Sequence, residues 1–265
     1  MRPVWVPILI AAIVRPCLSR IGAAIELLHA AALFHDDVID DADTRRSRQS
    51  THKNFAESHS TNGWVGESRR FGEGVAILVG DLAFVYSDRL MGDAPLAARE
   101  IWHELRIELN IGQLLDLIGT SRNERRRHKT ERICRYKSGK YTIERPLHLG
   151  AMLAAPERKE ELLPLLSAYG LPLGDAFQMR DDVMGVFGDT ALTGKPVGDD
   201  LREGKPTPLM AMAIERASHS QAKVLDKVGL DVLSDDDVLL RLQNVRRRTR
   251  TQSDAALELC VGHRK

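Results

Sequence analysis

The sequence predicts an all-α fold, and three observations support the prediction. Apolar residues recur at helical spacing through nearly all of the 265 residues. Aromatic residues make up only 5% of the chain, and alternating runs of β-branched residues are absent. The pattern breaks at turn-forming residues such as Pro16, Asn62-Gly63 and Gly188-Asp189. We therefore expect a bundle of about eight helices, with residues 1–265 forming a single domain.

The helices follow one another with short connections. The apolar run 4–14 is too short to span a bilayer, so we interpret it as a buried helix in preference to a signal sequence. Residues 57–70 are predicted to be a polar loop, and the charge run 121–132 a solvated connection or helix start. The predicted helices cover residues 4–14, 19–43, 69–92, 95–119, 129–153, 158–187, 205–227 and 235–249.

Charge and cysteine content exclude several classes of protein. Lys plus Arg number 38 and Asp plus Glu 37, and a net charge of +1 provides no electrostatic footprint for nucleic acid. The three cysteines are far apart, which indicates reduced thiols in a cytoplasmic protein, with neither a disulfide framework nor a zinc site. No apolar stretch is long enough for a transmembrane segment.

Aspartates are concentrated at the end of the apolar helix 19–43, in the segment HDDVIDDADTRR. Asp36 and Asp40 lie one turn apart on the same face, where like charges repel. The helix before them is apolar on nearly all sides, as in buried helices. A divalent cation such as Mg²⁺ would offset the repulsion. A solvated helix end is the alternative, although acidic residues at a helix C-terminus oppose the dipole.

A second apolar helix ends in paired aspartates, Asp181 and Asp182, in the segment FQMRDDVMGVFGD. Two such clusters predict a facing pair with metal ions between them. Basic residues accompany both clusters, and fixed cations together with metals are what a polyanionic phosphate needs. These basic residues are Arg45, Arg46, Lys137, Lys140, Lys195 and Lys205.

From Arg2 to about Thr207 the chain resembles the trans-isoprenyl diphosphate synthases, or polyprenyl synthetases. The motifs of the resemblance are HDDVIDDADTRR, FGEGVAILVGDL, GQLLDL, YKSGKYT, FQMRDDVMGVFGD and TGKPVGDDLREGK. It is most similar to bacterial members that make geranylgeranyl or similar diphosphates. The resemblance implies an isoprenoid-synthase helical bundle around a central cavity, a homodimer, and Mg²⁺-dependent condensation of isopentenyl diphosphate with an allylic diphosphate.

The resemblance also implies a role for each candidate site residue. The candidate metal ligands are Asp36 and Asp40 on one side and Asp181 on the other, supported by Asp37 and Asp182. The candidate contacts to the allylic diphosphate are Arg45, Lys137, Gln178 and Lys195, with Lys205 supporting the same phosphates. The candidate contacts to isopentenyl diphosphate are Arg2, His29 and Arg46. Of all these, the candidate catalytic residues are Asp36, Asp40, Asp181, Lys137 and Arg45.

Product length is expected to depend on the floor of an apolar tunnel below the first aspartates. In the family, bulky aromatics four or five residues before the first aspartate shorten the product. Here those positions hold Ala31 and Ala32, so we predict a product of C20 or longer. Phe84 and Tyr86 are a second candidate floor, or else ordinary core residues.

The chain departs from the family pattern at four places, one of which is the short segment after Ser234, where the resemblance is lost. Of the usual Gly-Gly-Lys-x-x-Arg-Pro only Arg2-Pro3 remains, and we expect the family's N-terminal helix to be missing. Ser47 replaces a glycine in a loop that would need positive φ, and Gly185 replaces the last aspartate of the second motif. Two alternative functions stay open: a non-catalytic or impaired subunit of a heteromeric synthase, and a class I terpene cyclase, although Gln178 with Asp181 fits the synthase better.

Overall fold

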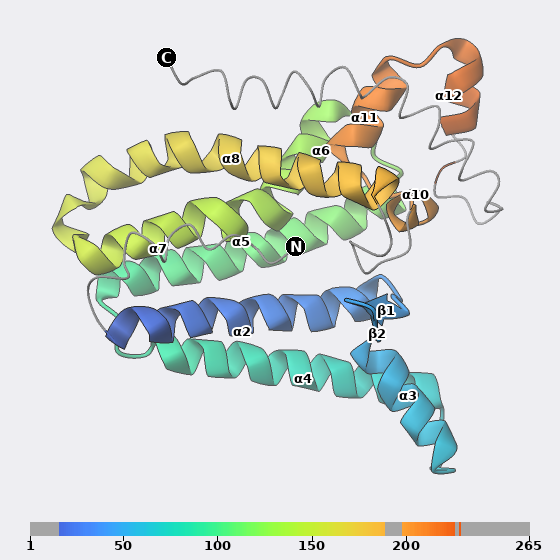
Figure 1. Cartoon of the computed structure of the whole chain (residues 1–265), viewed down its shortest axis with the longest axis horizontal. Helices are drawn as coiled ribbons and strands as arrows, with labels where there is room; N and C mark the ends of the chain where they lie inside the picture. The colour runs from blue at the N-terminus through green and yellow to red at the C-terminus, as the bar shows by residue number, and fades with distance from the viewer. Residues whose placement is uncertain (1–15, 189–197, 226–227, 229–265) are drawn as a thin grey trace. The chain divides into compact units, whose positions relative to one another are not determined.

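The computed structural model describes residues 16–188, 198–225 and 228 (Figure 1), and it confirms the predicted all-α class. Within these ranges the strands are confined to one short antiparallel hairpin, β1 (Thr44–Arg45) and β2 (Arg48–Gln49). None of the described helices combines the length and the apolarity needed to cross a membrane. The predicted helices 4–14 and 235–249 lie outside the described residues.

The chain divides into two compact units, residues 2–99 and residues 100–265 together with Met1. That the two form one domain stays a prediction.

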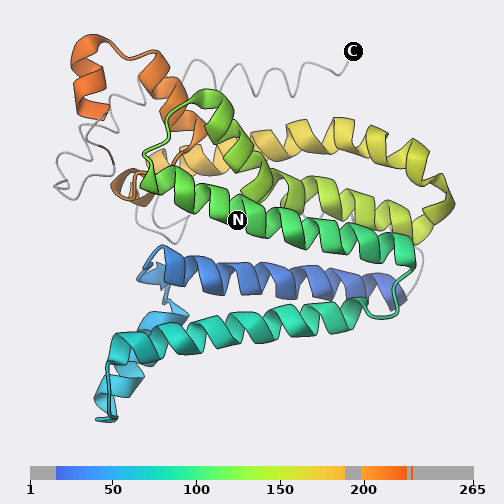
Figure 2. The same ribbon diagram turned by 180° about the vertical axis from the view of Figure 1, so that it is seen from behind.

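In the first unit two long helices, α2 (Pro16–Ile39) and α4 (Ser68–Met91), lie antiparallel and side by side, as Figures 1 and 2 both show. The helix α3 (Thr51–Thr61) packs against α4. Residues spaced three or four apart form one buried stripe on each long helix. The stripe of α2 is Ile21, Ala24, Leu28 and Ala31, and that of α4 is the mostly small set Gly72, Ala76, Gly80, Ala83, Ser87 and Met91.

The helix α2 ends at Ile39, earlier than the predicted residue 43. Asp41 has φ 49°, the left-handed conformation that terminates many helices. Its N–H donates to Val38 O (3.4 Å), and the N–H of Ala42 donates to Asp37 O (2.9 Å). This pair of hydrogen bonds is a Schellman motif, and it fixes the main chain beneath the acidic cluster.

The second unit contains three long antiparallel runs joined by shorter helices. α5 leads through α6 into a π-helix, η1, which continues as α7, and α8 then returns along them (Figure 1). The bounds are α5 (Leu96–Ser121), α6 (Arg127–Cys134), η1 (Arg135–Glu144), α7 (Arg145–Ala154), the 3₁₀ turn η2 (Pro156–Arg158), α8 (Lys159–Phe187), α10 (Asp199–Arg202), α11 (Pro208–Glu215) and α12 (His219–Leu225).

Three predicted elements need correction. Residues 57–61 belong to α3, because a buried face including His52 and His59 packs this polar segment as a helix, and the loop is limited to 62–67. The predicted α-helix 129–153 contains the π-helix η1. The predicted helix 205–227 begins late, because Thr207 caps α11 by accepting the N–H of Met210 at 3.2 Å, and it is split at residues 216–218 between α11 and α12. The charge run 121–132 is confirmed as a connection and helix start, with α6 beginning at Arg127.

Candidate functional site

The end of α2 and the β1–β2 hairpin together hold a cluster of opposite charges in the first unit. Arg45 Nε donates to Asp37 Oδ1 at 2.7 Å, and Arg45 Nη2 donates to Asp36 Oδ2 at 3.2 Å. Asp37 is only 3% exposed. Burial opposes the charge of Arg45, but its hydrogen bonds to Asp37 and the charges of both carboxylates outweigh burial and raise its pKa. The guanidinium therefore stays charged and offsets one of the two negative charges of Asp36 and Asp37.

The aspartates of the cluster have different partners. The N–H of Asp40 donates to Asp36 O at 2.8 Å, so the one-turn spacing predicted for these residues is confirmed although the helix ends before Asp40. Lys53 Nζ of α3 lies 2.9 Å from Asp41 Oδ1 and 3.1 Å from Asp43 Oδ1. Asp41 and Asp43 thus pair with α3, whereas Asp36 and Asp37 pair with the hairpin.

The turn of the hairpin confirms the predicted demand for positive φ. Arg46 has φ 54° and Ser47 has φ 61°, as both central residues of a two-residue type I′ turn require. Ser47 therefore occupies a backbone conformation that glycine adopts at lower cost. The turn aims Arg45 at the aspartates and leaves Arg46 exposed.

His29 lies within electrostatic reach of the same hairpin. Burial lowers its pKa, and the charges of Arg46 and then Arg45 lower it further. The imidazole is therefore neutral at pH 7 and keeps one donor and one acceptor nitrogen. The first unit thus brings together six of the predicted site residues, which are His29, Asp36, Asp37, Asp40, Arg45 and Arg46.

The residue before Asp36 fastens the acidic end of α2 to α4, a contact that the sequence did not predict. His35 Nε2 lies 3.1 Å from Ile77 O, and a Cβ at Gly80 would meet it at 2.2 Å. Only glycine at position 80 leaves room for this ring. The ring of Phe84 lies 5.7 Å from that of His35, so this candidate floor residue packs against the end of α2. The other candidate, Tyr86, is 52% exposed.

In the second unit the motifs GQLLDL and YKSGKYT meet at Lys137. Lys137 Nζ donates to Asp116 Oδ2 at 2.6 Å, and Asp116 is 8% exposed. A Cβ at Gly112 would lie 2.4 Å from Lys137 N, so glycine lets the main chain of η1 pack directly on α5. GQLLDL is one of the motifs of the family resemblance, but the sequence alone predicts no role for its residues, because their contact with Lys137 joins segments far apart in the chain. Asp116 and Gly112 are the residues that place Lys137.

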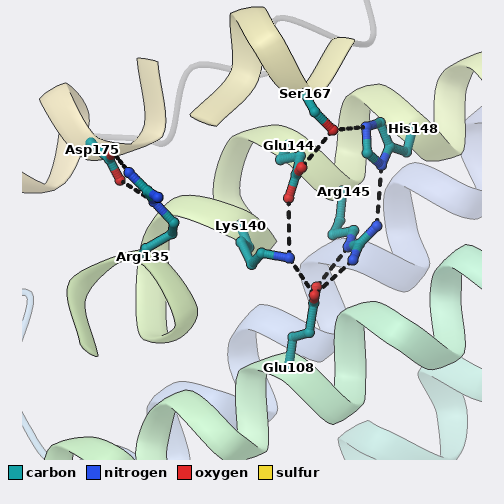
Figure 3. A network of polar contacts seen from close by, with 8 residues as sticks. All are labelled: Glu108, Arg135, Lys140, Glu144, Arg145, His148, Ser167 and Asp175. Atoms are coloured by element: carbon teal, nitrogen blue, oxygen red, sulfur yellow. Dashed lines mark hydrogen bonds and ion pairs between the residues drawn. The ribbon is translucent and has the colours of Figure 1, made fainter. Parts of the chain in front are cut away.

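Figure 3 shows a second buried network at the same π-helix, centred on Glu108 of α5. Lys140 Nζ donates to Glu108 Oε1, and Arg145 donates to the same carboxylate through Nε at 2.6 Å and Nη2 at 2.7 Å. Lys140 Nζ also lies 3.5 Å from Glu144 Oε2. The charges of the two acids and the two bases balance. Through Glu108, Lys140, which the sequence predicts to lie near the phosphates, ties η1 to α5.

A neutral histidine completes the network towards α8. Arg145 Nη1 lies 3.3 Å from His148 Nδ1, and Ser167 Oγ lies 3.0 Å from His148 Nε2. Because Arg can only donate, Nδ1 accepts and Nε2 carries the proton. The Ser167 hydroxyl then donates to Glu144 Oε1 at 2.6 Å. Burial, opposed by Glu144 and supported by Arg145, lowers the pKa of His148, which agrees with this neutral form.

The second aspartate motif lies in the last turns of α8. Asp182 is buried and its Oδ1 accepts from Gln178 Nε2 at 2.8 Å, whereas Asp181 is exposed. After the helix, the N–H of Gly198 donates to Gly185 O at 3.0 Å and returns the chain towards Lys205. Lys205 Nζ lies 2.9 Å from Glu203 Oε2. The predicted site residues Arg2 and Lys195 lie outside the described residues.

The fit of these carboxylates to a metal ion depends on how many ligands come together and on what the ion requires. Across residues 16–188 and 198–225, no three His, Cys, Asp or Glu side chains come together in a way that could hold one. Mg²⁺ usually takes one or two protein carboxylates and completes its shell with water and substrate phosphates. Asp36 and Asp40, oxygen donors one turn apart, fit that requirement, and Asp37 is instead committed to Arg45. That the two aspartate motifs face one another stays a prediction.

Comparison with known proteins adds evidence independent of this geometry. The sequence profile of the family described as Polyprenyl synthetase matches residues 1–238. The chain is 29% identical over 225 residues to the geranylfarnesyl diphosphate synthase of Aeropyrum pernix, covering 82% of this chain and 64% of that protein. It is 32% identical to the farnesyl diphosphate synthase of Escherichia coli, over 77% of this chain and 67% of the relative. The chain thus spans less than two thirds of the length of the first relative.

Solved structures of prenyl synthases also match this chain. The geranylgeranyl pyrophosphate synthase of Corynebacterium glutamicum, complexed with isoprenyl diphosphate and magnesium, matches with a TM-score of 0.82 and 38% identity, over 91% of this chain and 69% of that one. The polyprenyl synthase of Caulobacter crescentus, complexed with calcium and isoprenyl diphosphate, matches with a TM-score of 0.77 and 26% identity, over 94% of this chain and 70% of that one.

Proposed function

Since the chain belongs to the polyprenyl synthetase family, we propose that it is a Mg²⁺-dependent trans-prenyltransferase. Its substrates would be isopentenyl diphosphate and an allylic diphosphate, and its product a trans-polyprenyl diphosphate of C20 or longer. One observation carries the proposal: Asp36 and Asp40 stand one turn apart at the end of a long helix, with Arg45 clamped against Asp36 and Asp37. The arrangement supplies oxygen donors and a fixed cation for one diphosphate.

The carboxylates would share the metal ions between them. Asp36, Asp40 and Asp181 would be the principal ligands, and Asp37 and Asp182 would support them. Bound Mg²⁺ would supply positive charge against the charge that develops on the leaving diphosphate. The buried contacts of Asp37 to Arg45 and of Asp182 to Gln178 suit a supporting role, because these two carboxylates already accept hydrogen bonds from protein side chains.

Basic and amide side chains would bind the two diphosphates. Arg45, Lys137, Gln178 and Lys195, with Lys205, would contact the allylic diphosphate, and Arg2, His29 and Arg46 would contact isopentenyl diphosphate. Arg45, Lys137 and Lys205 already lie against carboxylates, so each is held near its working position before substrate arrives. Neutral His29 can donate one hydrogen bond to a phosphate oxygen without adding charge.

The chemistry accounts for this choice of residues. The allylic C–O bond breaks, its electron pair leaves with the diphosphate, and an allylic cation remains. The double bond of isopentenyl diphosphate attacks that cation, and loss of a proton to the leaving diphosphate restores a double bond. Fixed cations stabilise the departing charge, and apolar walls below them would keep water from quenching the cation.

The small residues below Asp36 support a long product. Ala31 belongs to the buried stripe of α2, whereas Ala32 is only half-buried one turn before Asp36. We therefore infer that Ala32, more than Ala31, leaves space for the growing chain. Phe84, packed against His35, is the aromatic residue on α4 that would limit it.

The active form would be a cytoplasmic homodimer. The helix α5 exposes apolar side chains at the spacing of a coiled-coil seam. They are Ile107, Ile111, Leu114 and Ile118. A second copy of the chain would cover such a seam in a two-fold dimer. Light scattering on the protein as it elutes from a size-exclusion column measures its mass and so tests the dimer. A monomer at micromolar concentration would contradict this part of the proposal.

The activity is tested by incubating the chain with Mg²⁺, isopentenyl diphosphate and C5, C10 or C15 allylic primers, and sizing the products. Asp36→Ala and Asp181→Ala should each lower the rate by at least about a hundredfold, since each removes a charge that acts on the transition state. Asp43→Ala is the matched control, because Asp43 belongs to the same acidic run but pairs with Lys53. Unchanged activity in the first two variants would contradict the proposal.

A further inference from the structure

One arginine of the charge run 121–132 is directed inward, and the proposed function leaves it without a role. Arg125 Nη1 donates to Gly204 O at 3.3 Å and to Lys205 O at 3.2 Å, and its Nη2 donates to Val228 O at 3.3 Å. These carbonyls belong to segments 79 to 103 residues away in the chain. One guanidinium thus joins the end of α5 to the segment that carries Lys205.

The turn that contains Arg125 orients it towards these carbonyls. Asn123 has φ 49°, and the N–H of Glu124 donates to Gly119 O at 2.8 Å, which closes the end of α5. The neighbouring Arg126 Nε donates to Glu124 Oε1 at 2.9 Å, and this contact holds the pKa of Glu124 down to about 2. Arg126 is thereby held on the outside of the turn, while Arg125 between the two is part-buried.

The segment held by Arg125 also makes contacts of its own. Gly204 has φ 66°, and Lys205 O also accepts the N–H of Thr207 at 2.9 Å. Pro206 packs against Gly119, where an added Cβ would meet its ring at 3.0 Å. Arg125 therefore bonds directly to the main-chain carbonyl of Lys205.

We propose that Arg125 is a positioning residue that fixes the main chain of Lys205, so that its ammonium group can reach the allylic diphosphate. This rests on the proposed function, in which Lys205 supports those phosphates. Arginine suits the role because its planar fork can serve several carbonyl acceptors at once, which a lysine ammonium on a flexible stem does less well. Lys205 Nζ is 2.9 Å from Glu203 Oε2, so a fixed main chain also fixes this ion pair. The substrate diphosphate must break the ion pair in order to bind Lys205.

The test compares Arg125→Met with Arg126→Met in the full chain. Both variants remove one positive charge from the same turn, but only the first removes the bonds to Gly204, Lys205 and Val228. With geranyl diphosphate as the primer, Arg125→Met should raise the KM for the primer about tenfold, because a displaced cation binds phosphate less well. The KM for isopentenyl diphosphate should stay within about twofold, and Arg125→Lys should recover part of the loss.

Two further measurements separate the possible outcomes. Amide hydrogen exchange at residues 198–207 should speed up in Arg125→Met and stay unchanged in Arg126→Met. Equal effects of the two variants, or equal rises in both KM values, would overturn the positioning role of Arg125. The proposed function of the chain as a prenyltransferase would then still stand. Conversely, a chain without turnover, in which Arg125→Met still weakens binding of inorganic pyrophosphate with Mg²⁺ and Arg126→Met does not, would overturn the proposed function and support the positioning role.

Discussion

Replacing Gly112 by alanine should damage the site while adding only one methyl group. The new Cβ would lie 2.4 Å from Lys137 N and 2.6 Å from Lys137 Cα, whereas an ordinary contact is at least 3.4 Å. The main chain of η1 would therefore have to move by about 1 Å, the difference between 3.4 Å and 2.4 Å, because no side chain can turn away. Overpacking of this kind costs about 1–3 kcal/mol of stability.

The displaced group is Lys137, whose Nζ is set 2.6 Å from Asp116. A shift of about 1 Å at a positioning contact can lower the rate by about a hundredfold, so kcat/KM for the allylic diphosphate should fall by about that factor. Steady-state kinetics and a urea midpoint are the measurements. Gly150→Ala on α7 is the matched control, since nothing lies within 4 Å of its added Cβ, and it should stabilise by about 0.5–1 kcal/mol. Full activity in Gly112→Ala would refute the reasoning.

Three other predictions follow from single features. Ser47→Gly should stabilise the chain by about 0.5–1 kcal/mol: relief of left-handed strain is worth about 1–2 kcal/mol, and added unfolded-state entropy removes about 0.4–1 kcal/mol. A urea midpoint that falls would contradict this. Ala32→Phe should shorten the product seen by chromatography, and an unchanged chain length would disprove the tunnel-floor argument. Burial holds the pKa of His148 below its usual value of 6.5. Below pH 6.5 the histidine therefore binds a proton more readily in the unfolded chain than in the folded chain, and the free energy of unfolding falls on acidification. His148→Gln should weaken this pH dependence, and an identical pH profile would show that other groups cause it.

The sequence predicted the parts of the fold that local rules determine. The helix α8 was predicted as 158–187 and spans 159–187, since an unbroken apolar period outweighs Pro164 and Pro172. The predicted end of α2 at residue 43 was wrong because a Schellman motif with Asp41 in the left-handed region stops the helix early. Asp is less typical than glycine at that position, so the sequence signal was weak.

The π-helix could not be predicted, because distant residues stabilise it. Its main chain packs on Gly112 of α5 and on Gly174 of α8, where an added Cβ would meet Gly139 O at 2.6 Å. Its Lys140 is tied to Glu108. Such contacts join segments tens of residues apart, and helical periodicity carries no information about them. The same holds for the site: motifs identified Lys137, but its partner Asp116 required the tertiary structure.

The contacts of the candidate site residues would also reconcile the proposed binding of diphosphates with a net charge of only +1. Arg45 lies against Asp36 and Asp37, Lys137 against Asp116, and Lys205 against Glu203. Each carboxylate holds a cation in a defined place and lowers the cost of leaving it partly buried without a ligand. In the proposed function a diphosphate would compete with a carboxylate for a cation that is already oriented, and little further ordering would be needed. Selectivity for a diphosphate would arise from where these few cations are fixed, because the chain as a whole carries almost no net field to attract an anion.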